Sequence, residues 1–462
     1  MGAYQIGLLG LGVMGSSLAK NLINHGFVTA LTSKNEAERA RFNHTGDYKI
    51  FDSNEAFVAA LKKPRVIFLM VTAGKPVDMV IEALSPLMEA GDAIIDGGNS
   101  FYQDTSRRYN ALAEKGIHYL GVGVSGGEKG ALEGPSMMVG GSRAAWETAR
   151  PFLTEVAAKI ADDTPCCDYL GAQGAGHYVK MVHNGIEYGI LQLIAETYQL
   201  LTKGMGYSVA QAAEVFARWR EGALSSYLID ITALVLSKAD ADSGEPLITK
   251  ICDMAGQKGT GNWTLLEGIA RGVYIPTIAE AVFARALSQK KALRQASVAT
   301  LSGPQNKTEL TELMLQQALH AGIVCCYTQG LELIAAASDE FGWNIDLEKT
   351  VSLWRGGCII RSVLLFDIME SYRTQQGLQN LMLAPRFAAL LNDLSDGWRK
   401  TVTQAAQSGI AAPALISTLS YYDSCRTDPM PTALVQGLRD CFGAHTYHRV
   451  DKEGSFHTDW EN

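Results

Sequence analysis

The chain has 462 residues, of which 47% are apolar and 19% are charged. This composition is too apolar for a disordered protein, and a net charge of −8 without any basic block excludes a general nucleic-acid-binding protein. No apolar stretch reaches the roughly 18 residues that a membrane helix needs, so we expect a cytoplasmic protein that does not contact a membrane. The length predicts two or three domains. The eight cysteines form no C-x-x-C motif and predict free thiols and no metal site.

The first third of the chain alternates short apolar segments with amphipathic ones. Residues 6–9, 28–31, 66–71 and 93–95 are predicted strands, and a helical pattern follows each of them. This βαβ order predicts an α/β Rossmann-like domain, with a doubly wound parallel sheet, over residues 1–175. The glycine-rich segment 121–141 is predicted to be a loop.

Strand signals almost disappear beyond about residue 170. Long helical patterns cover residues 176–201, 209–219, 310–341 and 385–407. We therefore expect a large all-α domain over residues 176–446. A short C-terminal tail, residues 447–462, should be ordered only if it docks on another surface.

A glycine motif follows the first predicted strand and opens a predicted helix. It has the pattern Gly-x-Gly-x-x-Gly and consists of Gly10, Leu11, Gly12, Val13, Met14 and Gly15. Glycines at this spacing allow a tight turn and a close approach of the backbone to a pyrophosphate at the helix N-terminus. The motif predicts a dinucleotide-binding site; an ordinary strand–helix turn is the alternative.

The end of the second strand bears on the choice of cofactor. NAD sites usually place a carboxylate there, but this chain has Ser33, Lys34 and Asn35, with no carboxylate until Glu36. A lysine could neutralise the 2′-phosphate of NADP, and its neighbours could donate hydrogen bonds to it. The pattern favours NADP, unless Lys34 is only a solvated loop cation.

One predicted helix carries an unusual polar face. Lys180, His183, Asn184, Glu187 and Tyr188 are spaced so that they lie on one side of it. Glycines at positions 176, 185 and 189 each cost a helix about 1 kcal/mol unless something must approach closely. A functional face therefore competes with the usual alternative, a solvated one.

The polar face suits acid–base chemistry. A desolvated Lys180 could act as a base, and Glu187 kept protonated in a closed pocket could act as an acid. With a nicotinamide cofactor, such a pair suits the oxidation of a secondary alcohol. Glycine-rich segments at 96–100, 121–141 and 257–261 could present backbone N–H groups to an anion or could be plain flexible turns.

Several stretches together resemble one family, the decarboxylating 6-phosphogluconate dehydrogenases of the oxidative pentose phosphate route. The matching stretches are GLGVMG, IDGGNS, GVSGGEKGALEGPSMM, GHYVKMVHNGIEYG, AGQKGTGNW, EAVFARAL, LWRGGCIIRS and FGAHTY. They extend from residue 10 to residue 447 and so cover nearly the whole chain. The shorter β-hydroxyacid dehydrogenases share the first motif and an equivalent lysine but lack the long helical domain.

The resemblance implies the chemistry of the site. Lys180 would accept the proton of the C3 hydroxyl while NADP takes the hydride, and the resulting 3-keto acid would lose CO2. Glu187 would then protonate the enediol at C1, giving ribulose 5-phosphate. His183 and Asn184 would act beside this pair.

The resemblance also implies the binding residues. The cofactor would be held by the glycine motif, by residues 33–35, by Val71, Thr72 and Ala73, and by Asn99. The substrate would be held by Asn99, Ser125, Gly126, Gly127, His183, Asn184, Tyr188, Lys258, Thr260 and Arg285. Arg439 and His445 would reach the site of the partner subunit in a homodimer, together with the tail. The helical domain, residues 176–446, would then be the substrate and dimerisation domain.

The chain departs from the family at the cofactor. The family usually has Asn-Arg-Thr or Asn-Arg-Ser where this chain has Ser33, Lys34 and Asn35, and often has a lysine where this chain has Thr72. An ammonium grips phosphate less specifically than a guanidinium does. Three alternatives therefore stay open: NAD preference, a near-isosteric acid such as 6-sulfogluconate, and, more remotely, a non-catalytic paralogue that acts as a binding protein.

Overall fold

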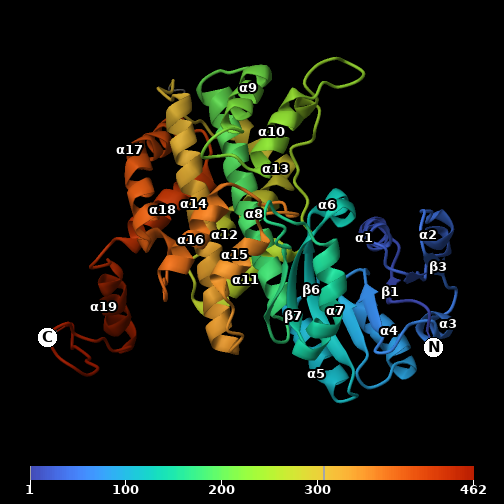
Figure 1. Ribbon diagram of the computed structural model, residues 1–462. Helices are drawn as coiled ribbons and strands as arrows, with labels where there is room; N and C mark the ends of the chain where they lie inside the picture. Colours follow the sequence, from blue (N-terminus) through green and yellow to red (C-terminus); the bar gives the residue numbers. More distant parts are fainter. Residues whose placement is uncertain (1, 305–306, 462) are drawn as a thin grey trace. The chain divides into compact units, whose positions relative to one another are not determined.

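The computed structural model describes residues 2–304 and 307–461, and its first part is an eight-stranded sheet (Figure 1). The strands are β1 (Ile6–Leu9), β2 (Thr29–Thr32), β3 (Tyr48–Ile50), β4 (Val66–Leu69), β5 (Ala93–Asp96), β6 (His118–Ser125), β7 (Ser136–Gly141) and β8 (Cys167–Gly171). Their order in the sheet is β3-β2-β1-β4-β5-β6-β7-β8. Neighbouring strands from β3 to β6 pair in parallel, β7 is antiparallel to β6, and β8 is parallel to β7.

Helices cover both faces of the sheet. They are α1 (Val13–Asn24), α2 (Glu36–Arg41), α3 (Asn54–Ala59), α4 (Lys75–Leu84), α5 (Tyr102–Ala113), α6 (Gly127–Glu133) and α7 (Arg143–Val156). Leu18 of α1 and Trp146 of α7 belong to the apolar core on one face, and Phe57 of α3 and Val80 of α4 to the core on the other. Alternate residues of β1, β2, β4, β5 and β6 supply the two cores. The doubly wound α/β fold predicted from the sequence is thus confirmed.

Segment 121–141 contains β6, α6 and β7, so the prediction of a loop there is wrong. A Cβ atom on Gly123 would lie 2.2 Å from Cβ of Lys180, and one on Gly140 would lie 2.3 Å from the backbone nitrogen of Gly176. These glycines are needed because helix α8 packs directly on β6 and β7. The glycines inside these two strands therefore indicate close backbone approach.

The rest of the chain is helical, as predicted. The helices are α8 (Ala175–Gln199), α9 (Val209–Trp219), α10 (Tyr227–Ser237), α11 (Thr260–Arg271), α12 (Pro276–Ser288), α13 (Lys291–Thr300), α14 (Glu312–Phe341), α15 (Leu347–Leu353), α16 (Leu364–Thr374), α17 (Pro385–Gln407), α18 (Pro413–Cys425) and α19 (Thr432–Gly443). Helix α8 continues into a π-helical turn, Leu200–Gly204. Helix α14 packs against both α8 and α17 (Figure 1).

Helix α14 is the core helix of this part. Its length and composition would allow it to cross a membrane, since an 18-residue window has a mean hydropathy of 1.2. The expectation that no stretch is apolar enough therefore does not hold for α14. However, 83% of that window is buried inside the protein, and its apolar side chains are covered by neighbouring helices.

The chain forms two compact units, one up to Thr418 and one from Leu419 onward. The sheet and the helices from α8 to α17 belong to the same unit, because α8 packs on β6 and β7. The division into domains at residues 175 and 446 stays a prediction.

The second unit contains α19 and the tail. Asp440 of α19 is fully buried and accepts hydrogen bonds from the backbone N–H groups of Thr446 and Thr458, at 2.9 and 3.1 Å. Its carboxylate also bonds Trp460 Nε1 and His457 Nδ1, both at 2.9 Å. The predicted tail, whose last residue Asn462 lies outside the described residues, thus docks on the helix of its own chain.

Candidate functional site

A cleft of about 600 Å³ opens at the carboxyl ends of β1, β4 and β5. Strands β1 and β4 are neighbours at the point where the strand order reverses, which is where open α/β sheets bind their ligands. The predicted cofactor residues that line the cleft are Gly12, Val13, Met14, Gly15, Val71, Thr72, Ala73 and Asn99. Lys258, predicted to bind the substrate phosphate, lines it as well.

The glycine turn fits a dinucleotide. Gly10 has φ +105°, and a Cβ on Gly15 would lie 1.9 Å from the carbonyl oxygen of Gly10, so both positions require glycine. A Cβ on Gly12 would meet no protein atom nearer than 3.7 Å and would instead fill the space above the turn. The first turn of α1 therefore presents free N–H groups to a pyrophosphate. Leu11, by contrast, is fully buried in the core.

The residues after β2 that are predicted to bind the 2′-phosphate of NADP do not line this cleft. Ser33 is buried and donates its hydroxyl proton to Glu38 Oε2 at 2.6 Å. Asn35 Oδ1 accepts a hydrogen bond from the N–H of Ala37 at 3.0 Å and so caps α2. Lys34 is exposed and has no hydrogen bond or ion pair with any residue that the structure describes.

The loop after β5 is held by Asp96, a residue that the sequence reasoning did not single out. Its buried carboxylate accepts hydrogen bonds from Gly98 N–H at 3.0 Å, from Ser100 Oγ at 2.6 Å and from the Tyr119 hydroxyl at 2.9 Å. These contacts fix the backbone on both sides of Asn99, the loop residue that lines the cleft. The sequence signal for this role is an aspartate at the end of a buried strand.

The polar face of α8 is buried rather than solvated. Lys180 is only 6% exposed, and its ammonium donates to Asn184 Oδ1 at 2.6 Å. The same nitrogen lies 3.4 Å from Ser125 Oγ and 3.4 Å from His183 Nδ1. Asn184 in turn donates to Thr260 Oγ1 at 3.2 Å. Four of the predicted site residues thus lie around the lysine in one cluster drawn from three elements.

Burial shifts the pKa values of the two predicted acid–base residues in opposite directions. Desolvation lowers the pKa of Lys180, although the nearby Glu187 carboxylate and Cys358 partly offset it. Desolvation raises the pKa of Glu187, offset in part by Lys180 and Arg285. The pKa of His183 lies well below its usual value because the ring is desolvated and lies beside Lys180. The site therefore favours a neutral imidazole and brings a basic and an acidic group toward neutral pH.

The residues predicted to bind the phosphate end of the substrate fall into two groups. Within the first unit, the Arg285 guanidinium stacks on the ring of Tyr188 at 3.4 Å and also donates to the carbonyl of Gly256 at 3.2 Å. Thr260 is buried at the start of α11. Arg439 and His445 are exposed residues of the second unit, where Arg439 donates to Gln436 Oε1 at 3.1 Å.

The glycines of α8 have a packing role. A Cβ on Gly185 would lie 2.5 Å from Thr264 of α11, and one on Gly189 would lie 2.7 Å from Cys326 Sγ of α14. Gly176 lies against the backbone of β7, where its Cβ would approach the Met138 carbonyl oxygen to 2.4 Å. The close approach inferred from these glycines is that of neighbouring elements, not of a ligand.

Gly126 and Gly127 join β6 to α6 with φ values of +110° and +64°. A Cβ on Gly126 would lie 2.6 Å from the carbonyl oxygen of Gly357, whereas one on Gly127 would meet nothing within 4 Å. This turn directly follows Ser125, so it fixes where that hydroxyl stands beside Lys180.

Further cleft residues have no counterpart in the sequence analysis. Phe101 and Trp263 line the cleft with their ring centroids 5.0 Å apart, and Asp104 and Val124 line it too. Trp263 belongs to the stretch AGQKGTGNW, but the motif alone does not predict that its aromatic side chain lines the cleft. Aromatic residues are common in cores, and their spacing gave no sign of a cleft.

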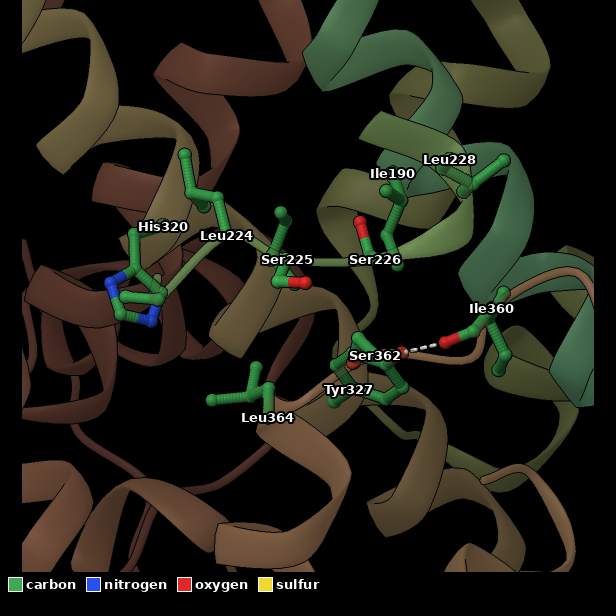
Figure 2. Close-up of a pocket in the computed structure, with 12 residues that line it drawn as sticks. Ile190, Leu224, Ser225, Ser226, Leu228, His320, Tyr327, Ile360, Ser362 and Leu364 are labelled. Carbon is green, nitrogen blue, oxygen red and sulfur yellow. Dashed lines mark hydrogen bonds between the residues drawn. The ribbon is translucent and has the colours of Figure 1, made fainter. Parts of the chain in front are cut away.

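A second, much smaller cavity lies among the helices (Figure 2). Its volume is about 20 Å³, and its walls include Ile190, His320 and Tyr327, whose hydroxyl donates to the Ile360 carbonyl at 2.6 Å. Such a volume holds a water molecule but not a sugar phosphate or a nucleotide. Another cleft, of about 680 Å³, lies between α9 and α10 and is lined by none of the predicted site residues. The cleft at the strand ends is the candidate site because the predicted cofactor residues and Lys258 line it.

Comparison with known proteins agrees with this geometry. Residues 5–171 match the NAD binding domain of 6-phosphogluconate dehydrogenase, and residues 176–460 match its C-terminal domain. The structure superposes on that of Plasmodium falciparum 6-phosphogluconate dehydrogenase with a TM-score of 0.95 and 38% identity, over 99% of this chain and 100% of the other. That enzyme is described in its apo form, with NADP+ and with 6-phosphogluconate.

Two Bacillus subtilis relatives match the chain over its full length. The NAD(+)-dependent decarboxylating 6-phosphogluconate dehydrogenase is 47% identical over 99% of both chains, and the NADP(+)-dependent one is 45% identical over 100% of both. Both parts of the chain and its whole length thus agree with the resemblance found in the motifs. The chain belongs to the decarboxylating 6-phosphogluconate dehydrogenase family.

Proposed function

We propose that the chain catalyses the oxidative decarboxylation of 6-phospho-D-gluconate to D-ribulose 5-phosphate and CO2 with reduction of NADP, as a cytoplasmic enzyme of the oxidative pentose phosphate route. The observation that carries the proposal is the buried cluster around Lys180. Its ammonium touches Asn184 and approaches Ser125 and His183, while the nearby Glu187 has its pKa shifted the opposite way.

Lys180 acts as the base for the oxidation step. Because its pKa is lowered by burial, a larger fraction of the amine is neutral near pH 7 than in an exposed lysine. The neutral amine accepts the proton of the C3 hydroxyl as C3 is oxidised. The ammonium that results then donates a hydrogen bond to the new carbonyl oxygen and stabilises the charge that develops there when CO2 leaves.

Glu187 acts as the acid that completes the reaction. Its raised pKa keeps a larger share of the carboxyl group protonated near neutral pH than in an exposed glutamate. Loss of CO2 leaves an enediol, and protonation of its C1 carbon by Glu187 gives ribulose 5-phosphate. His183 and Asn184 hold the reacting carboxylate and hydroxyls in place.

The phosphate end of the substrate is bound by cations and hydroxyls. Lys258 and Arg285 supply positive charge, and Tyr188 and Thr260 supply hydroxyl groups, which together suit a dianion. At the other end, Asn99, Ser125 and the backbone N–H groups of Gly126 and Gly127 bind the carboxylate and hydroxyls.

NADP, when bound, accepts the hydride that leaves C3. The glycine turn would hold its pyrophosphate, and Val71, Thr72, Ala73 and Asn99 would contact it in the cleft. Residues 33–35, which lie outside the cleft at the end of β2, would be the residues nearest its 2′-phosphate. Of residues 33–35, only Lys34 is positively charged, so the choice of NADP over NAD depends on few groups.

The chain acts as a homodimer in which Arg439 and His445 complete the partner subunit's site. Exposed apolar residues on α19, among them Leu434, Leu438 and Phe442, support this because they leave an apolar face uncovered in the single chain. Mixing K180M with R439A subunits tests it. If Arg439 acts across the interface, a random mixture of two inactive variants regains about a quarter of wild-type activity, because heterodimers keep one intact site. No recovery would place Arg439 in its own subunit's site.

Initial rates with 6-phosphogluconate and NADP, together with assays of CO2 and ribulose 5-phosphate, test the reaction. The same assays with NAD and with 6-sulfogluconate compare the alternative ligands. A higher kcat/KM for NAD would overturn the cofactor assignment, and a higher value for the sulfonate would overturn the substrate assignment. No turnover with any pair, with binding retained, would identify a binding protein.

A further inference from the structure

The carboxylate of Glu38 lies beside the glycine turn, and no sequence motif described above includes it. Glu38 lies in the first turn of α2, and its Oε2 accepts the hydroxyl proton of Ser33 at 2.6 Å. Its other oxygen, Oε1, lies 3.7 Å from the position that a Cβ on Gly12 would take, and apart from Gly12 and its chain neighbours no other described atom lies within 4 Å of that position. The half-buried side chain thus lies between the end of β2 and the turn that holds a pyrophosphate.

The contacts of Glu38 change the balance of charge at this end of the cleft. Ser33 has a single hydroxyl proton, and it is directed to Glu38, so it is not directed to a phosphate. The nearby Arg39 donates to the carbonyl oxygen of Ser33 and pairs with Asp52 at 3.3 Å. Lys34 is the one cation of residues 33–35, and it forms no ion pair with Glu38 or with any other residue that the structure describes.

We propose that Glu38 is the residue that sets cofactor discrimination: its carboxylate, held by Ser33 beside Gly12, accepts hydrogen bonds from the adenosine ribose hydroxyls of NAD and opposes the 2′-phosphate of NADP. Glu38 thereby reduces the advantage that Lys34 gives to NADP, and the chain uses both cofactors. This inference deepens the proposed function and rests on its nucleotide-binding part.

The physical basis is the charge at one position. A ribose diol has two O–H donors, and a carboxylate is the acceptor that NAD sites commonly offer it. A 2′-phosphate carries up to two negative charges, and placing it against a carboxylate in a half-buried position is unfavourable. The two Bacillus subtilis relatives, one NAD(+)-dependent and one NADP(+)-dependent, are 47% and 45% identical to this chain. Overall similarity therefore does not decide the cofactor, and single local residues can.

Titration calorimetry of the full-length protein tests the proposal without turnover. The probes are adenosine 2′,5′-bisphosphate and AMP, which differ only in the 2′-phosphate. In the variant Glu38→Gln the Ser33 hydrogen bond can persist while the charge is lost. We expect its affinity for the bisphosphate to rise about tenfold and its affinity for AMP to fall severalfold.

The matched control is Glu36→Gln, which removes the same charge from an exposed position of the same helix. If both variants change bisphosphate affinity equally, the effect comes from the general field, and the proposal is overturned. An unchanged ratio of bisphosphate to AMP affinity in Glu38→Gln would overturn it too. The variant Lys34→Ala should lower bisphosphate affinity and leave AMP affinity unchanged; an equal loss of both would show that the end of β2 does not meet the 2′-phosphate.

The outcome is separable from that of the proposed reaction. If Glu38→Gln shifts the affinity ratio while the wild-type protein fails to oxidise 6-phosphogluconate, the cofactor inference stands and the reaction assignment fails. If the reaction proceeds and the ratio does not move, the reaction stands and the inference fails. Thermal shifts with NAD and NADP provide a second readout that should follow the same order.

Discussion

The side-chain amide of Asn184 links Lys180 to Thr260: its oxygen accepts from the Lys180 ammonium at 2.6 Å, and its nitrogen donates to Thr260 Oγ1 at 3.2 Å. This one side chain therefore connects the proposed base on α8 with the first residue of α11. Because an amide is neutral, it orients the lysine without adding a negative charge that would raise the lysine pKa.

Replacing Asn184 with aspartate should move the pH profile of the enzyme. A carboxylate next to Lys180 favours the ammonium form, so the lysine pKa rises by about one unit or more. The neutral base is then populated only at higher pH, and the acidic limb of kcat/KM shifts upward. Rate measurements across pH check this. Thr260→Val removes the other partner of Asn184 without adding charge, so a similar shift in that variant would rule out charge as the cause.

The variant Lys180→Met should lose oxidation while it still binds 6-phosphogluconate. Removing the base costs roughly 10²–10⁴-fold in kcat, and methionine occupies a similar volume in the buried site. Cofactor reduction followed by absorbance measures the rate, and calorimetry measures substrate binding. Turnover close to that of the wild type would refute the assignment of Lys180 as the base.

The variant Glu187→Gln should separate the two halves of the reaction. Glutamine cannot donate a carboxylic proton, so ribulose 5-phosphate should form at least about 10²-fold more slowly. A first turnover of cofactor reduction should still occur. In D2O the wild-type product carries deuterium at C1, and the variant should incorporate it at the same reduced rate as it forms product. An unchanged steady-state rate would mean that another group protonates the enediol.

A buried carboxylate outside the site predicts how stability depends on pH. Desolvation raises the pKa of Glu196 to about 7, although hydrogen bonds from the N–H groups of Leu415 and Ala414 partly oppose it. The folded state therefore binds this proton more tightly than the unfolded state does. Stability from this group is present at low pH and is lost as the pH rises from about 4.5 toward 7, by about 3 kcal/mol.

The variant Glu196→Gln should lack this part of the pH dependence. Denaturant unfolding of both proteins at several pH values gives the difference, which should grow in favour of glutamine as the pH rises. Glu214→Gln, at an exposed site of α9, is the control and should follow the wild type. Parallel curves for all three proteins would contradict the raised pKa.

Local spacing was enough to predict the cofactor turn and the face of α8. The Gly-x-Gly-x-x-Gly pattern and the positions of Lys180, His183 and Asn184 lie within single elements, where 3.6 residues per turn fix which side chains meet. The resemblance then brought in Thr260 and Arg285, which spacing alone could not join to α8 because they lie on other helices.

The errors came from contacts between elements. Gly123 was assigned to a loop because glycine usually marks turns, whereas here it lets α8 bring Lys180 against β6. Glu38 reaches back to Ser33 from the following helix, whereas the pattern typical of NAD sites has its carboxylate directly at the end of β2. In both cases the deciding contact joins residues whose distance could not be read from the order of the chain.

The four hydrogen bonds that converge on Asp440 have a consequence for assembly. The segment beyond α19 already has a fixed shape in the isolated subunit, so little conformational entropy remains to be lost when another subunit meets it. Association through this end of the chain then joins preformed surfaces, and its rate is not limited by the folding of a disordered segment.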